Sequence, residues 1–306
     1  MPNAIVGLKE KTFTAYTPAQ GAHYANSRPD YHPDLYRSVL DHHRSTAGNF
    51  TTVIDVGCGP GLATRQLALH FDHAVGLDPS EGMLSTARSL GGVTSTSEPI
   101  QYQRSAAEDL ETISEGSVDL ITIANAAHWF DMPRFWVSAA RALKPGGTVA
   151  IWGPGEIRAH PDMPNADAIQ NAMEKHRDDH LLPYFEPGNW MTRGRYVDLP
   201  LPWTLDQPVE DFQESQFVRK DWVPEEPFFA VDVEMSLDQW EKITATSSPE
   251  TRWRQANPDL AGTERDIVKV LRKTVERLQQ EAGVEAGKEK VKGTVLGILL
   301  MFKKRV

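Results

Sequence analysis

The sequence predicts an α/β fold in which a doubly wound, mostly parallel sheet carries an inserted, largely helical cap. From Thr51 to Gly153, short apolar runs rich in β-branched residues alternate with longer amphipathic segments. This alternation is typical of parallel strands connected by helices. Over residues 154–262 Pro and Trp become frequent and the alternation is lost, which predicts a separate cap.

The core elements follow one another in a regular order. Strands are predicted at 52–57, 73–78, 99–106, 118–126 and 148–153. Helices are predicted at 61–71, 80–90 and 133–143, the last stopped by the Lys-Pro-Gly-Gly run at 144–147.

Three parts of the chain are expected. Residues 1–29 form an N-terminal lid segment within a helical entry that extends to residue 50. The core comprises 30–153 and 263–306, because apolar residues return at helical spacing over 263–281 and an apolar strand follows at 295–302. The cap, 154–262, contains five Trp residues, and large aromatic side chains are uncommon in disordered linkers.

Composition excludes several classes of function. The chain has 306 residues and a formal charge of −10, from 32 basic and 42 acidic residues. A net negative surface repels phosphate backbones, so nucleic acid is not the expected partner. No apolar run approaches the roughly 20 residues of a membrane span, and no secretory leader is recognised. The single cysteine, Cys58, fits a reducing cytoplasm, and the oligomeric state stays open.

A glycine-rich turn is the strongest signal in the sequence. The apolar strand Val53–Val56 runs into Gly57-Cys58-Gly59-Pro60-Gly61, and an amphipathic helix follows. Glycines allow the chain to turn tightly and let a ligand approach the backbone without a Cβ in the way. The turn is therefore predicted to bind a ligand.

Two ligand classes compete for this turn. A dinucleotide fingerprint needs Gly-x-Gly-x-x-Gly, and its last glycine would fall at Leu62 here. Asp55, at the end of the strand, would repel a pyrophosphate but attract an ammonium group. Asp78 ends the second strand, where it can bind the hydroxyls of an adenosine ribose. Adenosine with an amino group and no diphosphate describes S-adenosylmethionine.

These motifs resemble the class I S-adenosylmethionine-dependent methyltransferases, which have a Rossmann-like core. The resemblance rests on four segments within about 51–153: DVGCGPG, GLDPSEGML, SAAEDL and LKPGG. It implies that loop 57–61 lies along the methionine part of the cofactor and that Asp78 binds the ribose. It also implies that Met83 or Leu84 packs near the adenine, with Ala106, Ala107 and Glu108 at its edge. Alternatively, Asp78 is a helix cap, Met83 a core residue and Glu108 a solvated charge.

A second set of motifs is similar to the trans-aconitate methyltransferase-like branch, including its fungal small-molecule members. The run Asn125-Ala-Ala-His-Trp-Phe-Asp131 follows the fourth strand, and Tyr24–Tyr31 reads YANSRPDY. Since ligands bind beyond the carboxyl ends of the strands, Asn125 is expected to face the cofactor. Tyr24 and Arg28 are predicted to close over the cofactor, and Tyr16 to reach the acceptor.

The acceptor side is predicted from residue chemistry. His128 is the candidate catalytic residue, acting as a general base or as a hydrogen-bond donor that positions the acceptor, or else it is a packed ring. Trp129 is expected to wall the cleft. Of the cap arginines, Arg219 is the first choice to hold an acceptor carboxylate through its bidentate fork. No metal is expected, because the ten histidines show no HExxH pattern.

The sequence therefore predicts an enzyme that transfers a methyl group from S-adenosylmethionine to an oxygen of a small, carboxylate-bearing molecule. One alternative is methylation of a larger apolar natural product on O, N or S within the Trp-rich cap. Another is a cofactor-binding module without catalysis. Fold alone does not decide among the three.

Overall fold

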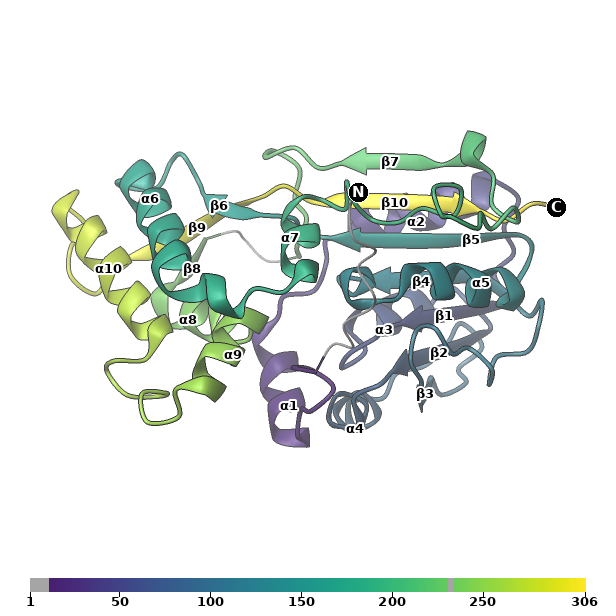
Figure 1. Cartoon of the computed structure of the whole chain (residues 1–306), viewed down its shortest axis with the longest axis horizontal. Helices are drawn as coiled ribbons and strands as arrows, with labels where there is room; N and C mark the ends of the chain where they lie inside the picture. The colour runs from purple at the N-terminus through teal and green to yellow at the C-terminus, as the bar shows by residue number, and fades with distance from the viewer. Residues whose placement is uncertain (1–10, 231–233) are drawn as a thin grey trace.

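The fold is built on two sheets that lie one after the other along the long axis of the molecule (Figure 1). The computed structural model describes residues 11–230 and 234–306. The larger sheet has the order β3 (Gln101–Arg104), β2 (His73–Asp78), β1 (Thr52–Val56), β4 (Val118–Ala124), β5 (Leu143–Gly153), β10 (Ile298–Lys303), β7 (Val218–Asp221). The smaller sheet has the order β6 (Ile157–Ala159), β9 (Lys290–Val295), β8 (Glu234–Ser236).

Strands β3, β2, β1, β4 and β5 of the larger sheet are parallel to their neighbours. Strand β10 is antiparallel to both β5 and β7. The strand order reverses at β1, as expected when helices cross over both faces of a sheet. The predicted fold class, a doubly wound and mostly parallel sheet, is confirmed.

Helices cover both faces of the larger sheet. They are α2 (Pro33–Ser45), α3 (Leu62–Ala68), α4 (Glu81–Leu90) and α5 (Met132–Ala142). Helices α2, α3 and α4 pack on one face and α5 on the other. Val53 points to the first face and Ile54 to the second, because successive side chains of a strand alternate. The predicted helices of the core are thus present.

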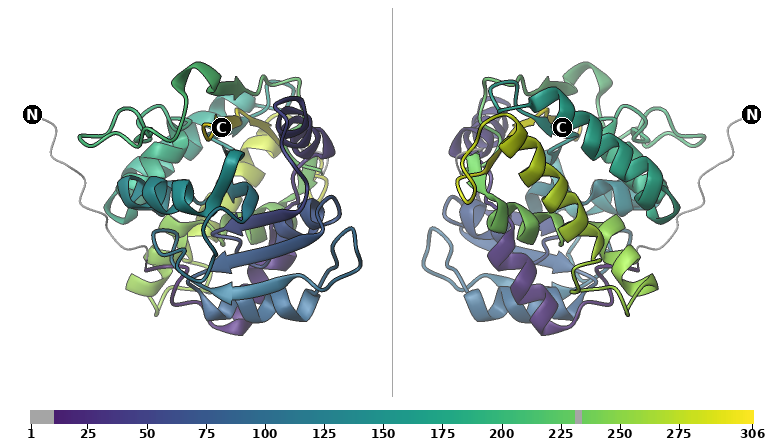
Figure 2. Two further views of the ribbon diagram at one scale, coloured as in Figure 1. Left: turned by 90° about the vertical axis from the view of Figure 1, so that its right-hand side faces the viewer. Right: turned by 90° about the vertical axis from the view of Figure 1, so that its left-hand side faces the viewer.

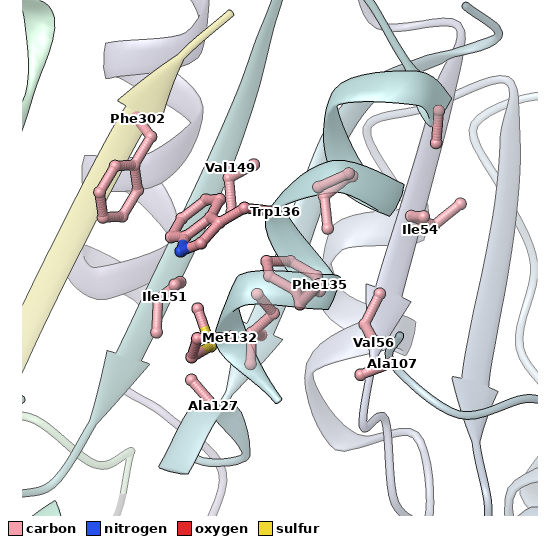
Figure 3. Close-up of a cluster of buried hydrophobic side chains, with 14 of the residues drawn as sticks. Ile54, Val56, Ala107, Ala127, Met132, Phe135, Trp136, Val149, Ile151 and Phe302 are labelled. Atoms are coloured by element: carbon pink, nitrogen blue, oxygen red, sulfur yellow. The ribbon is translucent and has the colours of Figure 1, made fainter. Parts of the chain in front are cut away.

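The α5 face of the sheet contains a cluster of large buried side chains. Trp136 lies between Phe302 of β10 and Val149 of β5 (Figure 3). Its ring centroid is 4.7 Å from that of Phe302, and its indole Nε1 donates to the carbonyl of Pro200 at 2.8 Å. Trp136 is therefore both packed and hydrogen-bonded, as a buried indole requires.

The cap contains the smaller sheet and the remaining long helices. These helices are α6 (Ala166–His176), α7 (Pro187–Arg193), α8 (Leu237–Thr244), α9 (Ser248–Ala256) and α10 (Ile267–Glu281). Short helical turns are η1 (Ala127–Trp129), η2 (Arg177–Leu181), η3 (Leu182–Tyr184) and η4 (Glu214–Gln216). The two views of Figure 2 show the core sheet from one end and the cap helices from the other.

The structure departs from the predicted cap boundaries at two places. Helix α10 was expected in the core, yet its apolar side packs with α6 and α8 in a separate hydrophobic cluster. Strand β7, within the expected cap 154–262, is the edge strand of the core sheet. Both differences arise because amphipathic spacing fixes which side of an element is buried and not what it is buried against.

The predicted strand at 295–302 also differs, because it is two strands in two sheets. Strand β9 ends at Val295 and β10 begins at Ile298. Figure 1 shows them end to end, crossing from the cap to the core. A Cβ on Gly297 would lie 2.1 Å from the Phe228 ring, so this junction requires a residue without a side chain.

Helix α1 (Pro18–Ser27) packs on α4 almost backbone to backbone. A Cβ on Gly82 would lie 2.0 Å from the carbonyl oxygen of Tyr16, and one on Gly21 2.4 Å from the carbonyl oxygen of Gly82. Helix α1 also contacts α8 of the cap. Helix α1 is thus held between core and cap, while residues 1–10 of the predicted lid lie outside the described residues. Among the described residues, no helix is both long and apolar enough for a bilayer crossing.

We predict that Trp136→Ala lowers the free energy of unfolding by about 3–5 kcal/mol, the usual cost of emptying a buried Trp site. Val137 is the matched control, because it is next in α5 and 60% exposed, so Val137→Ala should change stability by less than about 0.5 kcal/mol. Urea unfolding followed by circular dichroism measures both. Equal effects of the two substitutions would contradict the packing described here.

Candidate functional site

The glycine turn connects β1 to α3 at the carboxyl end of the sheet. Gly57, Gly59 and Gly61 have φ angles of 70°, 54° and 78°, a left-handed conformation that other residues rarely adopt. The backbone amides of Gly57 and Cys58 both donate to the carbonyl of Leu77 in β2, at 2.8 and 3.0 Å. The Cys58 side chain is buried, and burial raises the pKa of its thiol well above the usual value, so it is a neutral thiol.

Asp78 links this turn to the next one. Its carboxylate accepts from the backbone amide of Gly59 at 2.8 Å and from that of Ser80 at 2.8 Å. Ser80 in turn caps α4, because its hydroxyl accepts from the amide of Met83. Asp78 is only 8% exposed. Asp78 therefore holds the glycine turn in shape. Its predicted contact with the ribose of the cofactor stays a prediction.

Asp55 has a different environment from the one expected. Its carboxylate oxygens accept from the hydroxyls of Thr64 at 2.6 Å and Thr122 at 2.9 Å, and the side chain is 1% exposed. Burial raises the pKa of Asp55 to about 6, although the two threonine hydrogen bonds lower it. The predicted attraction of a ligand ammonium by Asp55 stays a prediction. Asp55 joins β1, α3 and β4 beneath the glycine turn.

The residues at the turn fit the cofactor that the sequence implied. A Cβ on Gly59 would have no other atom within 4 Å, so open space lies over this part of the backbone. Asn125, just after β4, has φ 54° and a buried side-chain Oδ1 without a hydrogen-bond partner in the described part of the chain. Gly57 lies against Ala126, the residue that follows Asn125, since a Cβ on Gly57 would be 2.6 Å from the Cβ of Ala126. Asn125 thus stands beside the glycine turn with an acceptor atom that a ligand N–H could satisfy.

The predicted adenine-side residues have mixed environments. Met83 is 3% exposed and Ala107 6% exposed, while Ala106 is exposed. The carboxylate of Glu108 accepts from the backbone amide of Asp131 at 2.7 Å, so Glu108 is not a solvated surface charge. None of these placements tests an adenine contact, which stays a prediction.

A cavity of about 350 Å³ lies between the core and the cap. The core contributes Asn125, His128 and Trp129, helix α1 contributes Tyr24, and Arg28 follows as the C-cap of that helix. Most of the wall comes from the cap, including Met163, Ile169, Met173, Leu181, Met235, Trp240, Leu271 and Glu250. The volume is at the lower end of the range for small-molecule sites.

His128 lines this cavity between two aromatic side chains, Trp129 and Tyr196. Its Nδ1 is 2.9 Å from the Tyr196 hydroxyl, and its ring centroid is 4.6 Å from that of Trp129. Desolvation lowers the pKa of His128 to about 3. The ring is therefore neutral near pH 7, and a group with so low a pKa is a weak general base. This favours the positioning and packing roles over the role of base.

Two residues predicted to contact the acceptor do not line this cavity. Arg219 is on the edge strand β7, outside the cavity lining, and its guanidinium pairs with both carboxylate oxygens of Asp221 at 3.0 and 3.1 Å. Tyr16 does not line the cavity either. Its ring is buried against Phe13, with centroids 5.3 Å apart, so it supports the wall from behind.

Several cavity residues were missed by sequence reasoning. Glu250 is in the first turn of α9, where an acidic residue is common at any helix. Arg252 does not line the cavity but supports its wall: it donates to the carbonyl of Tyr184 at 2.6 Å and to the carboxylate of Glu186 at 2.9 Å, and it lies over the Trp129 ring. No local pattern distinguishes such residues from surface charges, because their partners are far apart in the sequence.

The comparisons with known proteins agree with this geometry. Residues 54–151 match the family model Methyltransf_11, the methyltransferase domain. The fold, the glycine turn and this match together indicate a methyltransferase domain over these residues, with S-adenosylmethionine as its cofactor. Within the described residues no group of three or more His, Cys, Asp or Glu side chains could hold a metal ion.

Individual relatives are similar over part of their length. A Dictyostelium discoideum protein, provisionally named a methyltransferase, is 34% identical over 175 residues, 57% of this chain and 59% of that protein. A Saccharomyces cerevisiae protein, provisionally named an S-adenosylmethionine-dependent methyltransferase, is 33% identical over 133 residues, 44% of this chain and 45% of that protein. This chain therefore matches only about half of the length of these curated relatives.

A solved structure extends the likeness in fold to most of the chain. The Anaeromyxobacter dehalogenans protein, provisionally described as a type II methyltransferase, superposes with a TM-score of 0.57 at 21% identity. The superposition covers 91% of this chain and 97% of that one. At this identity the likeness concerns the fold alone.

We predict that Gly59→Ala weakens binding of S-adenosylhomocysteine by about 10-fold or more, equivalent to about 1.4 kcal/mol. The added methyl group would occupy the space over the loop. Gly116→Ala is the matched control for backbone strain, because Gly116 has φ 57° and equally open surroundings. Both substitutions should cost about 1 kcal/mol of stability, but the control should bind as the unmodified protein does in calorimetry. Unchanged affinity in Gly59→Ala would show that the loop does not hold the cofactor.

We further predict that His128 stays neutral from pH 8 down to pH 5, because its pKa is lowered by desolvation. NMR of the imidazole nitrogens measures this directly. Tyr196→Phe removes the hydrogen bond and should leave the ring neutral over the same range. A midpoint near 6.5 in the unmodified protein would contradict the buried environment, and a midpoint near 6.5 only in Tyr196→Phe would assign the effect to the hydrogen bond.

Proposed function

We propose that this chain transfers a methyl group from S-adenosylmethionine to an oxygen of a small acceptor that bears a carboxylate. The proposal depends chiefly on Arg28. Its side chain lines the cavity, its Nε is buried without a hydrogen-bond partner among the described residues, and its Nη2 donates to the carbonyl of Thr246 at 3.1 Å. A half-buried guanidinium with an unused, buried donor is suited to an anionic ligand.

The other cations that line the cavity already have acidic partners. The pairs are Arg158 with Glu156 and Glu174, Arg177 with Asp178, Arg193 with Glu156, and Lys292 with Asp162. Among the described Arg and Lys residues of the lining, Arg28 alone has no ion pair. An acceptor carboxylate would therefore displace no existing partner at Arg28.

Arg28 was expected at the cofactor, and two carboxylates compete for it: that of the cofactor and that of the acceptor. We assign Arg28 to the acceptor because it lines the cap cavity, whereas residues 57–61 of the glycine turn do not. The resemblance to the trans-aconitate methyltransferase-like branch supports an acidic acceptor as well.

The chemistry of a carboxylate acceptor suits this site. S-adenosylmethionine, when bound, supplies a methyl group on a positively charged sulfur. A carboxylate is already a nucleophile, so the neutral His128 need not remove a proton. His128 instead supplies a hydrogen bond or an apolar wall, while Trp129 and Tyr24 limit access of water. A phenol or hydroxyl acceptor would need a base that His128 does not provide.

A larger apolar acceptor is the second candidate, and the cap wall is the observation that favours it. Met163, Met173 and Met235 line the cavity together with Trp240, and methionines adapt to ligands of varied shape. Such an acceptor would be methylated on O, N or S. The third reading, a module that binds the cofactor without catalysis, would be supported by cofactor binding without methyl transfer to any acceptor.

We predict that the protein forms S-adenosylhomocysteine when S-adenosylmethionine is supplied with small carboxylic acids, and that the product releases methanol in alkali, as a methyl ester does. Arg28→Ala should lower kcat/KM for the acid by about 10- to 100-fold, the worth of a charged hydrogen bond. Binding of S-adenosylhomocysteine should change less than about twofold.

Arg177→Ala is the matched control, since Arg177 lines the same cavity but is paired with Asp178 at 2.7 Å. It should alter kcat/KM far less. An alkali-stable product would favour the second candidate. Weaker cofactor binding in Arg28→Ala, with the KM for the acid unchanged, would show that Arg28 binds the cofactor and not the acceptor.

A further inference from the structure

Buried polar atoms without a partner gather in one place. Six side-chain N or O atoms of the described residues are buried without a hydrogen bond, and three of them line the cavity: Arg28 Nε, Asn125 Oδ1 and Glu250 Oε2. Such atoms are uncommon, because each costs free energy unless something satisfies it. One donor and two acceptors that line a single cavity indicate a ligand with complementary groups.

Glu250 is the least expected of the three. It is in the first turn of α9, after Ser247, and no ion pair among the described residues includes it. Arg28, Arg193 and Arg254 lie within electrostatic reach, but Arg193 is paired with Glu156 and Arg254 with Asp266. The Glu250 carboxylate thus faces the cavity with one oxygen unused.

Stability does not account for this arrangement. A buried carboxylate is costly unless it is paired and hydrogen-bonded, and burial raises the pKa of Glu250 to about 7 in spite of the nearby arginines. An apolar side chain of the same length would avoid the cost. The position therefore suits an interaction that forms only when a ligand is bound.

We propose that Glu250 Oε2 accepts a hydrogen bond from a hydroxyl or ammonium group of the acceptor, while Arg28 binds the acceptor's carboxylate. The acceptor would then be a hydroxy acid or an amino acid, and Glu250 would determine this specificity. The inference rests on the proposed function and narrows its acceptor class. It is distinct from the cofactor contacts of the glycine turn, because Glu250 and Arg28 line the cap cavity.

Three four-carbon acids test the inference: succinate, malate and aspartate, which carry hydrogen, hydroxyl and ammonium at the same carbon. Calorimetry measures their binding to the full chain saturated with S-adenosylhomocysteine. Malate or aspartate should bind at least about 10-fold more tightly than succinate, the effect of one hydrogen bond to a charged group. The tighter of the two identifies the donor group.

Glu250→Met and Glu250→Gln assign the preference to this side chain. The Met variant keeps the length and removes the acceptor, so the three acids should bind equally, while the melting temperature stays the same or rises. The Gln variant keeps one acceptor oxygen and should retain part of the preference. Glu174→Gln is the control in the same cavity, because Glu174 is 3.6 Å from Arg158, and it should leave the preference unchanged.

The outcomes separate the two proposals. Failure of S-adenosylhomocysteine to bind would overturn the proposed function and this inference together. With S-adenosylhomocysteine bound, equal affinity for the three acids, no affinity for any of them, or a preference that survives in Glu250→Met would overturn the inference alone. A large drop in the melting temperature of Glu250→Met would also overturn it, by showing that Glu250 serves stability.

Discussion

The position of the cavity depends on a constraint of the backbone near the end of the chain. Strand β9 is the central strand of the cap sheet, and β10 lies between β5 and β7 in the core sheet, with only residues 296 and 297 between them. An extended chain of this length leaves little freedom for the two sheets to separate. The cap must therefore stand beyond the carboxyl ends of β4 and β5, where ligands of such folds bind.

The core could be predicted from the sequence because its signals are local. Each strand from β1 to β5 is a short apolar run, and each helix between them has a clear cap or stop, such as Asp131 before α5. The break between β9 and β10 could not be predicted in this way. It depends on Gly297 lying against the Phe228 ring, a contact between segments about 70 residues apart.

The same distinction separates the two halves of the site. The glycine turn was found from sequence because its three glycines, the strand before them and the helix after them are contiguous in the chain. The environments of Asp55 and Arg219 were not found from sequence. That of Asp55 depends on Thr122 in another strand, and that of Arg219 depends on the edge position of β7 in the sheet. Glu250 carried no signal at all, because what distinguishes it is a buried Oε2 without a hydrogen-bond partner among the described residues.

The division of the cavity wall has a consequence for how such proteins diversify. Asn125 and His128 on the core side belong to the turn that follows β4. Most of the cavity wall comes from cap helices, and residues 57–61 of the glycine turn are not part of that wall. Changes in α6, α8 or α9 can therefore accumulate without disturbing the cofactor loop. Proteins of this architecture can acquire new acceptors by drift in the cap while the core sequence stays recognisable.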